Sequence, residues 1–301
     1  MPTSIKKIIT HNGGFHTDDV FACATLLLLL EKKGEQGEII RTRDEAIIIT
    51  GDYVVDVGGI YDPAINRFDH HQIGGAGARG NGISFASFGL VWKEFGEELC
   101  GSKEVSEWID QKIVQPIDGP DNGISIATPI FEGVQPYTFH SILSSFEPSW
   151  KDKNEADIDS AFLELVSFAK GILSREIKKT KDTEDGIRLA NDIYEQTEDK
   201  RLVVLDESYP WKPAYEKNSD VLIVIYPSST DSRWKVETVP VKPYSFERRI
   251  YFPEAWAGLR DEALQKVTGV PDAIFCHFHR FLAVAKSKEG AIALAKQALA
   301  N

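Results

Sequence analysis

The 301-residue sequence has little cysteine and no long hydrophobic run. The three cysteines, Cys23, Cys100 and Cys276, lie far apart, so their spacing excludes a disulfide framework and a zinc-knuckle motif. The longest apolar stretch, VFACATLLLLL at residues 20–30, is too short to cross a bilayer and has the length of a buried helix. No cationic segment precedes an apolar stretch with a cleavage site, as a signal peptide requires. We therefore expect a protein of the reducing cytoplasm that does not associate with membranes.

Positive charge is also scarce. Lys and Arg number 34 against 46 Asp and Glu, which gives a formal net charge of −12. Such a chain does not wrap long nucleic acid by bulk attraction, because phosphate neutralisation needs Lys and Arg at the contact. Phosphate recognition would require bound cations or a local basic patch. The hydrophobic content of 42% fits a globular protein of one large domain or two ordinary ones.

Predicted strands and helices alternate in the first half of the chain. The expected strands, rich in Ile and Val, are IKKIIT (5–10), AIIIT (46–50) and DYVVDVG (52–58). The expected helices lie at 20–32, 91–99 and 105–114, the first of them capped by Thr17 or Asp18. Continuous apolar strands that alternate with helices indicate a parallel α/β sheet covered on both faces.

The polar segment SSFEPSWKDKNEAD, residues 144–157, interrupts this pattern and predicts a domain boundary. We expect an N-terminal domain at residues 1–147 and a smaller α+β domain at residues 155–301. Helices are predicted at 158–178, 183–197 and 288–299, and strands in RLVVLD, DVLIVIYP, RWKVETVPV, AIFCH and RFLAVAKS. SSTDS is expected to join the second and third of these strands as a hairpin.

Histidine is scarce and unevenly distributed, with four of the seven residues in the first 71 positions. With aspartates they form four clusters, each after a predicted strand or helix: His11, His16, Asp18 and Asp19; Asp56; Asp69, His70 and His71; Asp118 and Asp121. The ligand crevice of an open α/β sheet lies outside the carboxyl ends of its strands, so distant segments can meet there. Carboxylates and imidazoles without thiolates favour Mn²⁺, Mg²⁺, Fe²⁺ or Zn²⁺. Two such ions ~4 Å apart can generate a hydroxide and stabilise both oxygens of a phosphoryl displacement.

Each cluster also has a purely structural interpretation. The first can consist of loop histidines bonded to the backbone and of helix-capping aspartates. Asp56 in DVGGIYDP and the fourth cluster in IDGPDNG can form turns. The adjacent pair His70-His71 is hardest to explain in this way, because neighbouring strand residues point to opposite faces.

The segments HNGGFHTDD, VVDVGG, YDPAINRFDHHQ and IDGPDNGIS resemble the ordered motifs of the DHH phosphoesterase superfamily, which includes RecJ-type exonucleases and manganese pyrophosphatases. The similarity is greatest to its MYG-type branch, described as metal-dependent protein hydrolases and, in eukaryotes, as 3′–5′ RNA exonucleases. FPEAWAGLRDE and GVPDAIFCHFHRFLAVAKSKEGA extend the resemblance over most of the chain. It implies an N-terminal parallel-sheet DHH-type domain that holds the metals, and a smaller C-terminal domain that closes over the substrate.

Position by position, the resemblance implies two divalent ions, Mn²⁺ in the first place and Mg²⁺ as an alternative. The implied metal ligands are His11, His16, Asp18, Asp56 as a bridge, His70 and, in the fourth motif, Asp118 in preference to Asp121. His16 stands where the usual motif has an aspartate, which changes the charge of the ligand set. His71 is expected to face the phosphate, and Asp69 to orient His70.

On the C-terminal side, Arg280, His277 and Arg260 are the expected substrate-binding residues, since arginine binds phosphate bidentately. The pair Arg248-Arg249 is interpreted rather as a solvated surface pair. Cys276 beside His277 is not interpreted as a nucleophile, because consecutive strand residues point to opposite faces and no third group orients them.

The sequence therefore predicts a metal-dependent hydrolase, in the first place a 3′–5′ exonuclease acting on short or single-stranded oligonucleotides by a two-ion mechanism. One alternative is hydrolysis of a small phosphate compound, such as pyrophosphate or a dinucleotide, which the acidic charge favours. Another is a non-catalytic, metal-dependent binding protein. A homo-oligomer is compatible with the sequence.

Overall fold

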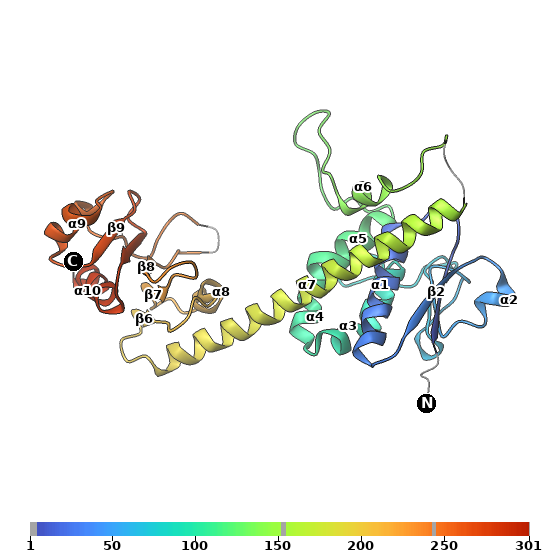
Figure 1. Ribbon diagram of the computed structural model, residues 1–301, viewed down its shortest axis with the longest axis horizontal. Coiled ribbons are helices and arrows are strands. Elements are labelled where there is room, and N and C mark those ends of the chain that lie inside the picture. Colours follow the sequence, from blue (N-terminus) through green and yellow to red (C-terminus); the bar gives the residue numbers. More distant parts are fainter. Residues whose placement is uncertain (1–4, 152–154, 243–244, 301) are drawn as a thin grey trace. The chain divides into compact units, whose positions relative to one another are not determined.

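The computed structural model describes residues 5–151, 155–242 and 245–300 (Figure 1). The chain divides into two compact units, Met1–Lys181 and Asp182–Asn301. The division falls inside one unbroken helix, α7 (Glu155–Gln196), where two separate helices were predicted. The N-terminal half of α7 carries Phe162, Leu165 and Leu173 into the core of the first unit. The boundary expected at residues 144–157 precedes this helix and stays a prediction.

The first unit contains a five-stranded sheet. Its strands are β1 (Lys6–Thr10), β2 (Gly37–Arg41), β3 (Tyr53–Val55), β4 (Tyr61–Asp62) and β5 (Arg67–Phe68), in the order β2-β1-β3-β5-β4. All neighbours are parallel except β4 and β5, which pair antiparallel. The predicted parallel sheet is therefore confirmed.

The expected strand at 46–50 is wrong. These residues belong largely to a short helix, α2 (Glu45–Ile48), capped by Asp44, whose side chain accepts the Ala46 N–H at 2.9 Å. The cap determines the local structure here, although Ile favours strands. β2 was not predicted, and it takes the edge position beside β1.

Both faces of the first sheet are covered. Ile8 points into the main core and its neighbour Ile9 into a smaller core with Ile48 and Val54, as expected for alternating strand residues. The helices of the unit, besides α2 and α7, are α1 (Thr17–Lys32), α3 (Ser87–Cys100), α4 (Lys103–Ile109), α5 (Gln115–Asp121) and α6 (Phe139–Ser144). A 3₁₀ turn spans Pro63–Ile65, and a π-helical turn (Asp110–Val114) joins α4 to α5.

The second unit is built on another five-stranded sheet, in the order β6-β7-β8-β10-β9. Its strands are β6 (Leu202–Val204), β7 (Ile223–Pro227), β8 (Trp234–Thr238), β9 (Ala273–Cys276) and β10 (Leu282–Ala285). Only β6 and β7 pair parallel, and the predicted β7–β8 hairpin is confirmed. The remaining elements are α8 (Trp211–Tyr215), a 3₁₀ turn (Glu254–Trp256), α9 (Asp261–Thr268) and α10 (Lys288–Ala300).

The α/β class, with two sheets, is thus as expected. Over the described ranges, the helices fall short of the combined length and apolarity that a bilayer crossing demands.

Candidate metal centre

The ends of three neighbouring parallel strands bring histidines and aspartates together in the first unit. His11 follows β1, Asp56 follows β3, and Asp69, His70 and His71 follow β5. Because β1, β3 and β5 are adjacent and parallel, these residues leave the sheet at the same edge. The start of α1 adds His16, Asp18 and Asp19, and the last residue of α5 adds Asp121.

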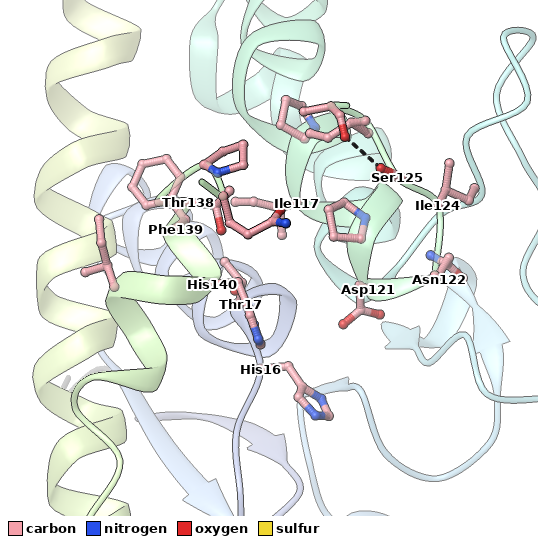
Figure 2. Close-up of a pocket in the computed structure, with 18 of the residues that line it drawn as sticks. His16, Thr17, Ile117, Asp121, Asn122, Ile124, Ser125, Thr138, Phe139 and His140 are labelled. Carbon is pink, nitrogen blue, oxygen red and sulfur yellow. Dashed lines mark hydrogen bonds between the residues drawn. The ribbon is translucent and has the colours of Figure 1, made fainter. Parts of the chain in front are cut away.

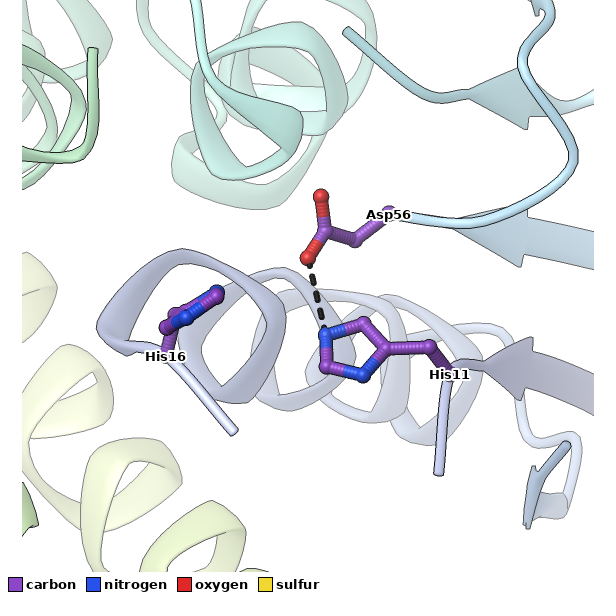
Figure 3. A group of neighbouring side chains, drawn as sticks. All are labelled: His11, His16 and Asp56. Atoms are coloured by element: carbon purple, nitrogen blue, oxygen red, sulfur yellow. Dashed lines mark ion pairs between the residues drawn. The ribbon is translucent and has the colours of Figure 1, made fainter. Parts of the chain in front are cut away.

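Asp56 lies at the centre of this cluster. Its Oδ2 atom is 3.2 Å from Nε2 of His11, and its Oδ1 atom is 3.4 Å from both Nε2 of His70 and Nδ1 of His71. Figure 3 shows His11 reaching Asp56 from the end of β1, with His16 beside them at the start of α1. Asp56 is buried and has φ +56°, a left-handed backbone that aspartate adopts more readily than most residues.

A second focus lies around His70. Its Nε2 atom is 3.3 Å from Oδ2 of Asp121 and 3.9 Å from Oδ2 of Asp18. Three sets of donor atoms lie within 4.8 Å of one another: His11, His16 and Asp56; Asp56, His70 and His71; His16, Asp18 and Asp121. Because the sets share Asp56 and His16, they form one continuous cluster.

Several carboxylate oxygens of the cluster are buried without a hydrogen bond. Oδ1 of Asp18, Oδ2 of Asp19 and Oδ2 of Asp56 accept none from the described residues, although His11 Nε2 lies 3.3 Å from Asp19 and 3.2 Å from Asp56. Isolated buried carboxylates are costly unless a cation or proton compensates them. The donor set therefore fits divalent cations of the hard or borderline type.

The pKa values of the buried aspartates reflect the same close spacing of negative charges. Burial, together with Asp56, raises the pKa of Asp18 well above its ordinary value and that of Asp19 to about 7. Burial would also raise the pKa of Asp56, but the imidazoles of His11 and His70 beside its carboxylate hold that pKa well below its usual range. Of these three aspartates, Asp56 is the one that stays ionised.

The two aspartates of the fourth motif have different surroundings. Asp118 is fully buried, where its carboxylate accepts the Gly89 N–H at 3.0 Å and a hydrogen bond from Arg79 at 2.8 Å. A Cβ atom at residue 89 would lie 1.8 Å from Oδ2 of Asp118, so this approach requires glycine. Asp121, three residues later, faces His70 instead. The structure therefore brings Asp121 to the cluster, and Asp118, which the sequence favoured, pairs with Arg79.

Asp69 contacts His71, whereas the sequence led us to expect that it orients His70. Its Oδ1 atom lies 2.8 Å from Nδ1 of His71 and accepts the backbone N–H of the same residue at 3.0 Å. Its Oδ2 atom accepts the Gly59 N–H at 2.6 Å. The chain turns directly after β5, and an aspartate at a turn commonly bonds the residue two positions on.

Ser87, the first residue of α3, is a site residue that sequence reasoning missed. Its hydroxyl donates to Oδ1 of Asp56 at 3.0 Å, and its backbone N–H donates to Oδ2 of Asp18 at 3.3 Å. A serine at a helix start is common as a cap, so its position in the sequence did not distinguish it.

A pocket of about 1090 Å³ opens beside the cluster. His16, His70, His71 and Asp121 line one part of it, and most of the remaining lining belongs to residues 116–142. Figure 2 shows His16 and Asp121 close together, with Thr138, Phe139 and His140 on a separate segment of the wall. His140 is a second residue that the sequence did not single out, because it lies in no recognised motif.

The expected substrate-binding residues of the second unit are engaged locally. Arg280 lies over the Tyr251 ring at 5.4 Å and donates to the Phe252 carbonyl at 3.3 Å. Arg260 lies over the Phe275 ring at 4.3 Å. Nδ1 of His277 accepts the backbone N–H of residue 279 at 3.1 Å. Their role toward a substrate stays a prediction.

The neighbouring Arg248-Arg249 pair is not the solvated surface pair that we expected. Arg249 donates to four backbone carbonyls, those of Tyr215, Glu216, Asn218 and Val221. Arg248 donates to the Thr238 carbonyl at 3.0 Å. Both side chains therefore hold loops of the second unit together. Cys276 is buried, and burial raises the pKa of its thiol to about 12, which fits an unreactive side chain.

The family model for MYG1 exonucleases, described as an uncharacterised protein family (UPF0160), matches residues 7–299. The chain belongs to this family. The resemblance to the MYG-type branch is thereby confirmed over nearly the whole chain.

Two members of the MYG1 family illustrate the similarity. MYG1 protein C27H6.8 of Caenorhabditis elegans is 34% identical, with 96% of this chain and 94% of that protein covered. The MYG1 exonuclease of Homo sapiens is 32% identical, with 98% and 86% covered. Among solved structures, RecJ in complex with Mn²⁺ from Thermus thermophilus aligns at 12% identity and a TM-score of 0.27. The alignment covers 98% of this chain, which spans about half the length of that RecJ chain.

Proposed function

We propose that the protein is a divalent-metal-dependent phosphodiesterase that removes nucleotides from the 3′ end of short or single-stranded oligonucleotides. The observation that carries this proposal is the cluster around Asp56, whose overlapping donor sets include buried carboxylate oxygens without hydrogen bonds. Several relatives, the human one among them, bear the name exonuclease, which supports the same reaction class.

The metal ligands follow from the two foci of the cluster. His11, His16 and Asp56 would hold one ion, and Asp56, His70, Asp18 and Asp121 a second, with Asp56 between them. When bound, ions such as Mn²⁺ supply a hydroxide at neutral pH and positive charge against the phosphate oxygens. Ser87 keeps Asp56 oriented through its hydroxyl.

His71 is positioned for proton transfer. Asp69 occupies its Nδ1 atom, so the hydrogen on that nitrogen points at the carboxylate and Nε2 is left for the substrate. The side chain is 58% exposed and lines the pocket. In its doubly protonated form, an imidazole held in this way can donate the Nε2 proton to the leaving oxygen, as general acids do, and it is left as the neutral ring with its hydrogen on Nδ1.

Pyrophosphate hydrolysis fits the pocket less well. Among the described residues that line it, none is lysine or arginine. Pyrophosphate carries several negative charges and no apolar surface. The ions would therefore have to neutralise almost all of its charge by themselves.

The test is a substrate panel on metal-stripped protein, with Mn²⁺, Mg²⁺ and Zn²⁺ added separately. Single-stranded RNA and DNA labelled at either end, a dinucleotide and pyrophosphate would be compared. We expect Mn²⁺ to give stepwise shortening from the 3′ end and Asp56→Asn to lower the rate at least about 100-fold. Arg188→Ala, an exposed residue of the second unit, is the matched control and should leave the rate unchanged.

Hydrolysis of pyrophosphate alone, or no rate increase with any divalent ion, would contradict the proposal. Asp56→Asn with full ion content and full rate would remove the central role of Asp56.

A further inference from the structure

We propose that residues 122–127 and 135–138, which line the pocket between α5 and α6, receive the nucleobase of the nucleotide at the scissile phosphate, with the ring of Tyr137 as the stacking surface. This inference rests on the proposed phosphodiesterase function and adds a substrate class to it. The pocket would then recognise a single nucleoside beside the ions rather than a longer run of phosphates.

The pocket has two chemically different walls. The cluster side is polar and carries His16, His70, His71 and Asp121. The opposite side is mostly apolar, with prolines, isoleucines and two aromatic rings: Pro116, Ile117, Pro120, Ile124, Ile126, Pro136, Tyr137, Phe139 and Ile142. These two walls match a nucleoside phosphate, which has a charged phosphate at one end and a flat base at the other.

The charge of the lining restricts the occupant further. Phosphate tracts are bound by Lys and Arg, and the described lining of this pocket contains neither. The lining therefore favours one phosphate at the ions and an uncharged group in the rest of the volume.

Tyr137 is the free aromatic surface of this wall. The residue is 74% exposed, and no hydrogen bond or ring contact engages its side chain within the described part of the chain. Phe139, in contrast, packs edge-on against Phe21 with ring centroids 5.4 Å apart, so it belongs partly to the core. An exposed ring next to a phosphate site is the usual platform for a base.

Two polar side chains of the same wall are already engaged by the backbone. The Asn122 side-chain amide donates to the Asp118 carbonyl at 2.9 Å, and the Ser125 hydroxyl donates to the Ala127 carbonyl at 2.9 Å (Figure 2). Both donors are occupied by the backbone. Since every base has a flat face, we expect the four bases to be accepted at similar rates.

The experiment compares dinucleotides that carry both bases with analogues in which one base, at either end, is replaced by hydrogen. We expect wild-type protein with Mn²⁺ to cleave the base-bearing substrate about 10-fold better in kcat/KM than one of the two abasic analogues. Tyr137→Ala should remove about that factor on the base-bearing substrate and change the rate on the abasic one less than about 2-fold. Tyr137→Trp should keep the preference.

Phe131→Ala is the matched control, because Phe131 is an equally exposed aromatic of the same segment that does not line the pocket. It should behave as wild type. Thermal unfolding of each variant verifies that the fold is retained, which the exposure of Tyr137 leads us to expect.

Equal cleavage of base-bearing and abasic substrates by wild-type protein would overturn the inference and leave the proposed function standing. Equal loss on both substrates in Tyr137→Ala would overturn it as well, since the ring would then act on the fold. If no oligonucleotide is cleaved with any ion, the proposed function fails, and this inference fails with it.

Discussion

Asp69 holds the ring of His71 by a 2.8 Å contact to Nδ1 and holds its backbone by a 3.0 Å hydrogen bond. The same nitrogen lies 3.4 Å from Asp56, so His71 stands between a carboxylate of the turn and a carboxylate of the cluster. This geometry gives the adjacent residues His70 and His71 different surroundings. Both rings line the pocket, but His70 is directed at aspartates of the cluster, whereas the side chain of His71 is far more exposed.

We predict that His71→Gln retains bound metal but loses turnover. A proton donor contributes about 100-fold or more to such reactions, so kcat should fall by at least that factor. His70→Gln should instead lower the metal content. Elemental analysis of both variants, with rates at saturating Mn²⁺, distinguishes the two outcomes. Loss of metal in His71→Gln would assign that residue to the ligands.

Asp118 and Asp121 should respond to substitution in opposite ways. Asp118→Ala leaves the largely buried Arg79 with Asp110 as its remaining carboxylate partner, so the free energy of unfolding should fall by about 3 kcal/mol. Asp121→Ala should lower the affinity for Mn²⁺ and leave the stability of the metal-free protein within about 0.5 kcal/mol. Urea unfolding without metal and calorimetric titration with Mn²⁺ measure the two effects. A stability loss confined to Asp121→Ala would reverse the assignment.

Ser87→Ala should weaken metal binding without removing a ligand. The hydroxyl that orients Asp56 is lost, and such outer contacts contribute about 10- to 100-fold in metal affinity or activity. Ser87→Thr keeps the hydroxyl and is the control. The concentration of Mn²⁺ at half-maximal rate should rise at least about 10-fold in the alanine variant only. Equal behaviour of both variants would show that the hydroxyl does not act through Asp56.

The metal-free protein should lose stability as the pH rises. Burial raises the pKa of Asp19 to about 7 and that of Asp18 well above its ordinary value near 4. The folded state thus keeps protons that the unfolded chain releases, so this contribution is present below about pH 4 and is lost as the pH rises through about 7.

Divalent ions compete with these protons for the carboxylates. The increase in melting temperature on adding Mn²⁺ should therefore be larger at pH 8 than at pH 5.5, by about 4 °C or more. Thermal unfolding with and without Mn²⁺ at each pH gives the difference, in which the titrations of groups away from the metal ligands cancel. An equal or smaller increase at pH 8 would contradict the protonated state assigned to these aspartates.

The sequence predicted a parallel first sheet, with the strands β1 and β3, and the convergence at its edge because strand ends and metal-type residues coincide along the chain. The strands β2, β4 and β5 were not predicted. Four segments distant in sequence, which carry His11, Asp56, His70 and Asp121, lie together in the structure. The sequence did not decide between Asp118 and Asp121. The two aspartates lie three positions apart on α5 and differ only in the side of the helix that they face. That choice depends on Arg79, which comes from a loop with no recognisable pattern.

Other features depended on tertiary contacts that no local pattern reports. Ser87 contacts Asp56 only after α3 has packed against the sheet edge. The short α2 replaced a predicted strand because Asp44 caps it. The two helices predicted between 158 and 197 are one, because apolar residues of α7 such as Leu165 and Leu173 pack on the core of the first unit.

The positive φ of Asp56 limits the amino acids that position 56 can accept, in natural variants and in a mutant library alike. Residues at ease in that backbone conformation are chiefly glycine, asparagine and aspartate, and side chains with a carboxylate are only aspartate and glutamate. Aspartate alone belongs to both sets. Saturation mutagenesis at codon 56 should therefore return a single fully active amino acid, with asparagine the best-folded of the inactive ones.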